Sequence, residues 1–339
     1  MTDGRAGAPV PCRVVLDTDG GIDDALAMLF LSGLRDARLE AIGTVAGNVD
    51  AAQAAENMLR LREACALPPV TTAVGCQRPL IEPGDAVAGF HGTDGLGDAG
   101  LPAAKGRPSG EHAVDQLLRL ARASPGRYVL LTTGPLTNLA TAVTIEPNLP
   151  GLLARVVVMG GSVAVAGNRA PVAEANIAHD PEAAAIVLGA GFDLTLVGLD
   201  VTMTTTLGPT DIARLESTST VQAQVASGIL AHYLLAYEEQ LGGRSCPLHD
   251  PLAAGIAADP SLVLDTWEIG ASVELHGRHT RGTTVVDRRF GGMAGGPTHI
   301  AKKVDGQRFV SQLLAVLTTP YPSAPDPGGA VLRSPVVDV

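Results

Sequence analysis

Aromatic residues and lysine are scarce in this chain. Phe, Trp and Tyr together make up 3% of its 339 residues, so Ala, Val and Leu must fill the large core that a 46% hydrophobic content allows. Lysine occurs only at positions 105, 302 and 303, and the formal net charge is -11. A chain with this charge balance is a poor partner for a phosphate backbone. We therefore expect no nucleic-acid partner.

Membrane and secretory signals are also missing from the sequence. The first residues, MTDGRAGAPVPC, contain no basic start followed by an apolar core. No uninterrupted apolar run approaches the roughly 20 residues that cross a bilayer. Cys12, Cys65, Cys76 and Cys246 form no CxxC pair and no zinc-type spacing. The sequence predicts a cytoplasmic protein with reduced thiols and no membrane partner.

Strand and helix patterns alternate along most of the chain. Apolar runs such as RYVLLTTG, RVVVMGG and FDLTLVGLD read as buried strands, and helical spacing follows at Ala51 to Glu63 and Ala183 to Leu188. Pro135 is expected to open a further helix. Residues 79 to 110, which include HGTDGLGDAG, show neither period and predict a long loop that could act as a lid. The alternation predicts parallel βαβ units.

The stretch VVLDTDGGIDDALAMLF crowds four aspartates, Asp17, Asp19, Asp23 and Asp24, around a glycine turn between a buried strand and a helix. Their carboxylates should converge at the C-terminal end of the strand, where open α/β sheets bind ligands. Helix capping would account for Asp23 and Asp24 alone. Because crowded like charges need a cation or a shared proton to offset their repulsion, the stretch predicts a metal site.

Polar residues also follow the other predicted strands: Asn48, Thr132, Thr133, Met159 with Gly160, and, in AGNRAPVAEANIAHDP, Asn168, Glu174 and Asn176. Each alone is typical of a turn or a helix cap. Because the C-terminal strand ends of such a sheet face one crevice, we expect these side chains to lie together. Asn, Glu and Asp side chains suit a ligand with vicinal hydroxyls, whereas a phosphate would favour Lys, Arg or a glycine cradle.

Two HDP tripeptides occur, at 179–181 and at 249–251, each at a predicted helix start. Helix capping explains both. The local pattern does not rank them.

These motifs together resemble the inosine-uridine nucleoside hydrolase family, from about Val14 to about Leu317. DTDGGIDDA resembles the family's DxDPGxDDA, and VAGN, HGTDG, TTGPLTN, VVMGG, VAEANI with DPEAA, and LHDPLA follow in the family's order. The resemblance implies an open α/β fold with a mostly parallel central sheet flanked by helices and the active site at the strand C-terminal ends. It also implies a bound Ca²⁺, hydrolysis of the N-glycosidic bond of ribonucleosides, and a homo-oligomer, either a dimer or a tetramer.

The resemblance further implies a domain plan. Residues 1–12 form an N-terminal extension and residues 13–318 form a single nucleoside hydrolase-like domain. Residues 319–339, which contain five prolines, are expected to form a disordered tail.

The resemblance assigns roles to individual residues. It gives the metal to Asp19, Asp24, the Thr133 carbonyl and Asp250, with Asp17 behind them, and it places Asp23, Asn48, Met159, Asn168, Glu174 and Asn176 around the ribose. Asp19 then takes the proton of a calcium-bound water, and His249, beside the leaving base, protonates that base. His91 lies on a loop that closes over the base.

Two positions depart from the family pattern. Gly20 stands in place of a proline, which would loosen the aspartate turn, and Ala175 stands in place of a frequent aromatic residue in the pocket.

The base preference stays open at this point. Tyr233 and Tyr237 share one face of the predicted helix LAHYLLAYEEQ, where they either contact a nucleobase or pack in the core. Arg244 is another possible leaving-group donor. The sequence does not separate a uridine or cytidine preference from an inosine preference or broad specificity.

Two other functions are alternatives to hydrolysis. LDTDGG also resembles the DxDGT start of haloacid-dehalogenase-type phosphatases, but Lys105 is badly placed for that chemistry and the second acidic motif is missing. A calcium-dependent nucleoside-binding protein without turnover would not need Asp19 and His249 intact.

Overall fold

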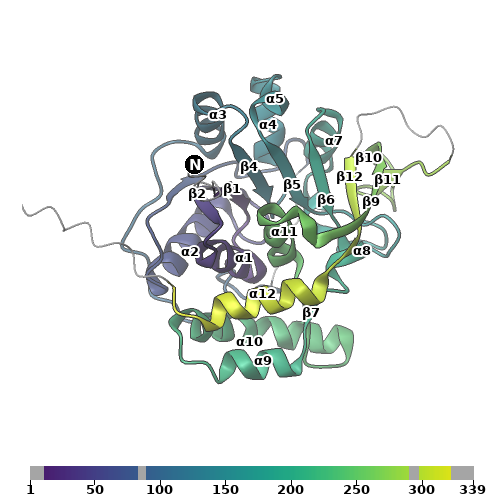
Figure 1. Cartoon of the computed structure of the whole chain (residues 1–339). Helices are drawn as coiled ribbons and strands as arrows, with labels where there is room; N and C mark the ends of the chain where they lie inside the picture. The colour runs from purple at the N-terminus through teal and green to yellow at the C-terminus, as the bar shows by residue number, and fades with distance from the viewer. Residues whose placement is uncertain (1–10, 83–88, 290–297, 322–339) are drawn as a thin grey trace, which may run out of the picture.

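The structure is a computed structural model that describes residues 11–82, 89–289 and 298–321. A central eight-stranded sheet has helices on both faces (Figure 1). The strand order is β3-β2-β1-β4-β5-β6-β12-β9, and every pair is parallel except β12 with β9. The predicted open, mostly parallel α/β fold is therefore confirmed.

The strands of this sheet are β1 (Cys12–Thr18), β2 (Ala37–Thr44), β3 (Thr71–Val74), β4 (Tyr128–Thr132), β5 (Arg155–Met159), β6 (Leu194–Val197), β9 (Val263–Ile269) and β12 (Thr298–Val304). Two short antiparallel pairs lie outside it, β7 (Thr206–Leu207) with β8 (Cys246–Pro247) and β10 (Ala271–Val273) with β11 (Thr284–Val286).

The helices are α1 (Ile22–Gly33), α2 (Ala51–Ala64), α3 (Ala113–Ala123), α4 (Thr137–Ile145), α5 (Leu149–Leu152), α6 (Ala175–His179), α7 (Pro181–Gly189), α8 (Leu199–Thr202), α9 (Pro209–Glu216), α10 (Val221–Leu241), α11 (His249–Ala258) and α12 (Gly306–Thr318), with a 3₁₀ turn at Pro260–Leu262. None of these described helices combines the length and the apolarity that a bilayer crossing requires.

Two hydrophobic cores lie on opposite faces of the sheet, because successive strand side chains point to opposite faces. Val14 and Leu16 of β1 belong to the core that α1, α10, α11 and α12 cover. Val15, between them, belongs to the core under α3, α4 and α7. Figure 1 shows α3, α4 and α7 on one side of the sheet and α1, α10 and α12 on the other.

Some element bounds differ from the sequence prediction. The helix expected from Pro135 begins at Thr137. The strand expected through 192–200 ends at Val197, because the Leu199 N–H donates to the Gly161 carbonyl and the chain turns into α8. The stretch LEAIGTVAGN reads as a strand that ends at Asn48, whereas β2 ends four residues earlier, at Thr44. Such boundaries depend on tertiary hydrogen bonds that local periodicity does not contain.

The proposed chain limits fall partly outside the described residues. Regular structure begins at Cys12 and ends at Thr318 within the described ranges. Three ranges lie outside the described residues. Residues 1–10 hold most of the expected extension, residues 322–339 most of the expected tail, and residues 83–88 part of the expected lid loop. Tyr321 is described, and its hydroxyl donates to the Leu29 carbonyl at 2.5 Å. The domain plan stays a prediction.

The strand order reverses between β1 and β4. From β1 the chain continues outward to β2 and β3 on one side, whereas β4, β5 and β6 continue outward on the other. In open parallel sheets, a crevice forms at the C-terminal ends of the two strands that flank such a reversal. The aspartate turn follows β1 and Thr133 follows β4, so the sheet topology places both at this crevice.

Gly20 sits at the centre of the aspartate turn with φ +74°. A Cβ atom at this position would lie 2.5 Å from the Ala54 Cα, and the Gly20 carbonyl accepts a hydrogen bond from Asn57 Nδ2 at 3.0 Å. Proline, with φ fixed near −65°, does not fit this backbone. Asn57 links the turn to α2 in place of a proline ring. The expectation that glycine loosens the turn stays a prediction.

Replacing Gly20 by alanine should destabilise the fold more than the same change at Gly126. Both glycines have positive φ, and a Cβ at Gly126 meets nothing within 4 Å. We expect Gly126→Ala to lower the free energy of unfolding by roughly 1–2 kcal/mol from the left-handed backbone alone. Gly20→Ala adds the clash with Ala54, which typically costs a further 1–3 kcal/mol or so. Urea unfolding with excess chelator measures the free energy of unfolding of both variants. Equal losses in the two variants would show that the close approach of Gly20 to Ala54 does not affect stability.

Candidate functional site

A cavity opens at the crevice between β1 and β4, with about 780 Å³ of empty space including its mouth. This size is typical of a small-molecule site. Every residue predicted to bind substrate lines it, namely Asp23, Asn48, His91, Met159, Asn168, Glu174, Asn176, Tyr233 and Tyr237, together with His249, Thr133 and Asp250. Asp19 and Asp24 are buried next to it.

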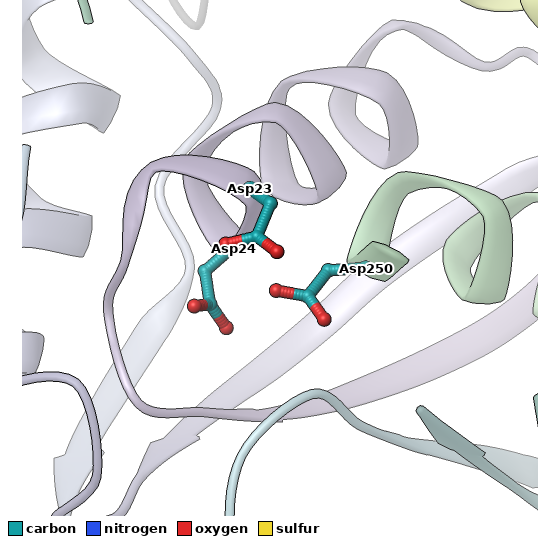
Figure 2. A group of neighbouring side chains, drawn as sticks. All are labelled: Asp23, Asp24 and Asp250. Atoms are coloured by element: carbon teal, nitrogen blue, oxygen red, sulfur yellow. The ribbon is translucent and has the colours of Figure 1, made fainter. Parts of the chain in front are cut away.

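Three aspartates gather at the closed end of the cavity. Asp23 and Asp24 come from the first turn of α1 and Asp250 from the first turn of α11, and one carboxylate oxygen of each lies within 4.8 Å of the others. Figure 2 shows the three side chains pointing toward one another. α1 packs against α11 across the core, and this packing brings together residues more than 220 positions apart in the sequence. All three side chains are buried.

The pKa values of the aspartates show that the cluster is under electrostatic stress. Burial first, and then repulsion from Asp24, raise the pKa of Asp23 to about 7. Burial, followed by repulsion from Asp23, Asp24 and Asp19, raises the pKa of Asp250 well above its ordinary value. Asp23 Oδ1 is buried without a hydrogen-bond partner among the described residues. Hard carboxylate oxygens in this arrangement fit a divalent cation such as Ca²⁺.

Asp24 is held by a full set of hydrogen bonds. Its Oδ1 accepts from the hydroxyls of Thr18 and of Thr133, the latter at 2.6 Å, and its Oδ2 accepts from the Gly21 N–H at 2.8 Å. The last bond caps α1. Helix capping and a place in the acidic cluster are therefore compatible for this residue.

Asp19 lies beside the cluster and faces Asn48. One carboxylate oxygen accepts from the Asn48 N–H and the other from Asn48 Nδ2, both at 2.9 Å. Burial, and then repulsion from Asp24, raise the pKa of Asp19 well above its ordinary value. The structure thus gathers Asp23, which had been assigned to the ribose, with Asp24 and Asp250, and holds Asp19 against Asn48.

Amide and carboxylate groups form one wall of the cavity. Glu174 caps α6, with Oε1 accepting from the Asn176 N–H at 2.9 Å and Oε2 from the Gly161 N–H at 2.9 Å. Asn176 Nδ2 donates to the Thr133 carbonyl at 3.0 Å and to the Met159 carbonyl at 3.1 Å. Burial raises the pKa of Glu174. These bonds tie the segments after β4 and β5 to α6 in one rigid polar surface.

Asn168 is the exposed member of this wall. Its Oδ1 accepts from the N–H of Ala175, the residue at which the chain departs from the family pattern, at 2.9 Å. Ala175 itself lines the cavity.

Aromatic rings line the opposite wall. The rings of Tyr233 and Tyr237 on α10 are 4.8 Å apart and nearly perpendicular, and Phe90 packs edge-on against both. The Tyr233 hydroxyl donates to Asp23 Oδ2 at 3.2 Å. Both tyrosines therefore have an apolar body in the core and a hydroxyl at the polar site.

His249 stands between two hydroxyl groups. Its Nδ1 lies 2.8 Å from Thr202 Oγ1, and its Nε2 lies 2.8 Å from Tyr237 Oη. Burial lowers the pKa of His249 to about 4, with a smaller contribution from His91. Burial therefore favours the neutral form of this imidazole.

His91 reaches the cavity from the loop after β3. Its Nδ1 accepts a hydrogen bond from the Ile22 N–H at 3.1 Å, and Nδ1 lies 3.9 Å from Asp23 Oδ1. Burial lowers the pKa of His91 to about 4. The ring is thus anchored to the start of α1.

Three other candidates lie outside the cavity. Asp17 is buried behind the cluster, where it accepts from Asn138 Nδ2 at 2.7 Å. Arg244 is exposed and forms an ion pair with Glu216 at 2.5 Å, so it is not placed to donate to a leaving group. Asp180 of the first HDP caps α7 through the Ala183 N–H at 3.1 Å. Of the two HDP tripeptides, only the second contributes its His and Asp to the cavity lining.

Sequence reasoning missed several residues at the site. Four further residues line the cavity, namely Phe90, Arg169, Met203 and Gln240. Thr202, which does not line it, contacts His249. Phe90 adjoins His91 in sequence, and Gln240 follows Tyr237 by three positions on α10, so both carried a local signal. Thr202 and Met203 carried none, because they follow the segment that was expected to be a strand.

Comparison with known proteins gives one consistent family. The family model described as inosine-uridine preferring nucleoside hydrolase matches residues 14–311. The chain is 35% identical over 302 residues to the inosine-uridine preferring nucleoside hydrolase of Leishmania major, covering 88% of this chain and 95% of that protein. It is 32% identical over 303 residues to the pyrimidine-specific ribonucleoside hydrolase RihA of Salmonella gallinarum, with 88% and 96% covered. The fold matches a plant nucleoside hydrolase, PpNRh1, with a TM-score of 0.88 at 31% identity over 91% of this chain and all of that one.

Proposed function

Since the chain belongs to the inosine-uridine preferring nucleoside hydrolase family, we propose that it cleaves the N-glycosidic bond of ribonucleosides to ribose and free base, with Ca²⁺ as cofactor and Asp19 as general base. The observation that carries this proposal is the meeting, in one cavity, of the aspartate cluster, the Asn and Glu wall and the His249 pair. The cluster suits a cation and the wall suits sugar hydroxyls.

The residues present fit a bound Ca²⁺. Asp23, Asp24 and Asp250 offer hard oxygens within 4.8 Å, Asp23 Oδ1 has no hydrogen-bond partner among the described residues, and Thr133 lines the same cavity. Asp19 would complete the set expected from the sequence. When bound, Ca²⁺ would offset the repulsion among the carboxylates, ligate ribose hydroxyls and lower the pKa of nearby water.

Asp19 is suited to take a proton from the attacking water. Its two bonds from Asn48 fix the direction of the carboxylate. Burial and the charge of Asp24 make it a stronger base than an exposed aspartate. As the glycosidic bond breaks, positive charge grows on the ribose, and the buried carboxylates and Glu174 stabilise it.

His249 and Tyr237 supply the proton to the departing base. The Nε2–Oη contact of 2.8 Å couples the two side chains at the aromatic end of the cavity. A neutral imidazole can serve as a hydrogen-bond donor in catalysis, so the lowered pKa of His249 does not remove this role. Phe90, Tyr233 and Tyr237 provide apolar surface for the base.

The rival functions have less support in the structure. A phosphatase of the haloacid-dehalogenase type would need a lysine beside its aspartates, and no lysine is among the described residues that line the cavity. The base preference stays open, because the relatives' names include both inosine-uridine and pyrimidine substrates. A cytoplasmic location and a homodimer or homotetramer stay predictions from the sequence.

A panel of ribonucleosides tests the function directly. We expect stoichiometric ribose and free base from at least one of inosine, uridine, cytidine and guanosine. Release of inorganic phosphate from sugar phosphates without ribose from nucleosides would instead indicate the phosphatase. Tight nucleoside binding without product would indicate a binding protein.

Removal of divalent cations should abolish activity and lower the thermal stability of the chain. A cation held at 100 times its dissociation constant stabilises the native state by about 2.7 kcal/mol. In Asp250→Asn this response to Ca²⁺ should be lost, whereas metal-free Asp250→Asn should be at least as stable as the metal-free parent because one repelling charge is gone. Asp115→Asn, at an exposed aspartate in the first turn of α3, is the control. Equal Ca²⁺ responses in Asp250→Asn and the parent would remove Asp250 from the site.

Deoxyribonucleosides should be very poor substrates. The ribose 2′-hydroxyl is expected to meet Asp23 and the cation, and its loss leaves buried polar groups unpaired. A site built around a substrate hydroxyl can reject the analogue lacking it by roughly 10⁴-fold. Values of kcat/KM for uridine against 2′-deoxyuridine, and inosine against 2′-deoxyinosine, measure this at fixed base. Discrimination under about tenfold in both pairs would contradict the diol site.

A further inference from the structure

We propose that Thr202 is a positioning residue that fixes the tautomer of His249 and thereby directs the Tyr237 hydroxyl proton toward the leaving base. The inference rests on the proposed hydrolysis and adds a residue that does not line the cavity. Thr202 ends α8, is fully buried, and reaches His249 through a contact between segments that are 47 positions apart.

The Thr202 hydroxyl has one acceptor within reach. Thr204 and Thr205, which follow it, donate their hydroxyls back to the Val201 carbonyl. The Thr202 hydroxyl makes no such bond, and among the described residues its hydrogen bond goes to His249 Nδ1 at 2.8 Å. A buried hydroxyl proton without an acceptor is costly, so Thr202 donates and Nδ1 accepts.

This direction determines the rest of the chain of hydrogen bonds. A neutral imidazole carries one N–H, and with Nδ1 accepting, that proton sits on Nε2. Nε2 then donates to Tyr237 Oη across 2.8 Å. Because the phenol oxygen accepts from His249, its own proton does not point at the imidazole. That proton is left for the neighbouring Tyr233 hydroxyl, with which Tyr237 interacts, or for a base in the cavity that both tyrosines line.

The proton balance of the step is simple. As the C–N bond breaks, its electron pair goes to the base, the base takes the proton of the Tyr237 hydroxyl, and the oxygen of the attacking water bonds to the ribose carbon. The Nε2–H of His249 stabilises the phenolate that is left. Asp19 holds the proton released by water, and exchange with solvent after product release returns one proton to Tyr237 and removes the one on Asp19.

Thr202→Val tests the role of the hydroxyl with little change in shape. Valine cannot donate to Nδ1, so the imidazole loses the bond that selects Nε2–H, and Tyr237 can turn its proton to Nε2. Loss of one buried hydrogen bond that supports the transition state corresponds to roughly a tenfold to 100-fold fall in kcat. Thr202→Ser keeps the donor and should stay within about threefold of the parent.

The leaving group separates positioning from general damage. Protonation matters only for a poor leaving group, so Thr202→Val should lower kcat on inosine or uridine and change turnover of 4-nitrophenyl riboside by less than about threefold. Thr205→Val is the matched control, since Thr205 is also buried on the same segment and, among the described residues, its hydroxyl bonds only to the Val201 carbonyl. Equal losses on both ribosides, or a Thr202→Ser as slow as Thr202→Val, would overturn the proposal.

A spectroscopic measurement decides the tautomer without turnover. In protein labelled with ¹⁵N-histidine, the His249 signals, identified by their absence in His249→Gln, should show Nε2 protonated and Nδ1 bare in the parent and in Thr202→Ser. Thr202→Val should show a mixture. A parent with Nδ1 protonated would overturn the assignment, whereas failure of every nucleoside to release ribose would refute the proposed function and leave this measurement valid.

Discussion

Repulsion among buried carboxylates is the constraint on which the rest of this structure depends. Asp23, Asp24 and Asp250 meet within 4.8 Å in a region that excludes water, and Asp19 adjoins them. Such a cluster is unfavourable by itself, because desolvation and mutual repulsion both oppose ionisation. The proposed cation and the hydroxyls of a ribose would relieve it. The elements around the cluster hold the carboxylates in place in spite of their repulsion.

Two helix starts and one tight turn supply that restraint. Asp23 and Asp24 lie in the first turn of α1 and Asp250 in the first turn of α11, where the helix dipole favours negative charge. The Thr18, Thr133 and Gly21 bonds fix Asp24, and the positive φ of Gly20 lets the turn lie against α2. The cluster is thus built on the rigid parts of the fold, which a site with demanding geometry requires.

The surroundings of His249 follow a different principle. There the chain surrounds His249 with Tyr237 and Thr202 and removes it from water, so that the ring stays neutral and its role depends on which nitrogen carries the proton. In the proposed reaction, the acid step at His249 would therefore depend on hydrogen-bond direction, whereas the base step at Asp19 would depend on charge. His249 and the aspartates Asp23 and Asp250 line the same cavity.

Local sequence determined much of this protein. The alternation of apolar strands and helices specifies parallel βαβ units, and VVLDTDGGIDDALAMLF specifies a strand, a glycine turn and a helix that begins with two aspartates, because these features depend on near neighbours. The ordered motifs pointed to the family. The resemblance had grouped Asp250 with Asp19 and Asp24. Only the tertiary structure decided that Asp23 joins Asp24 and Asp250, that Asp19 faces Asn48, that Arg244 stays outside and that Thr202 touches His249. The packing of α1 on α11 and the burial of His249 arise from contacts between residues far apart in the chain, and no local spacing encodes which of two HDP tripeptides lies at the crevice or how far burial moves a pKa.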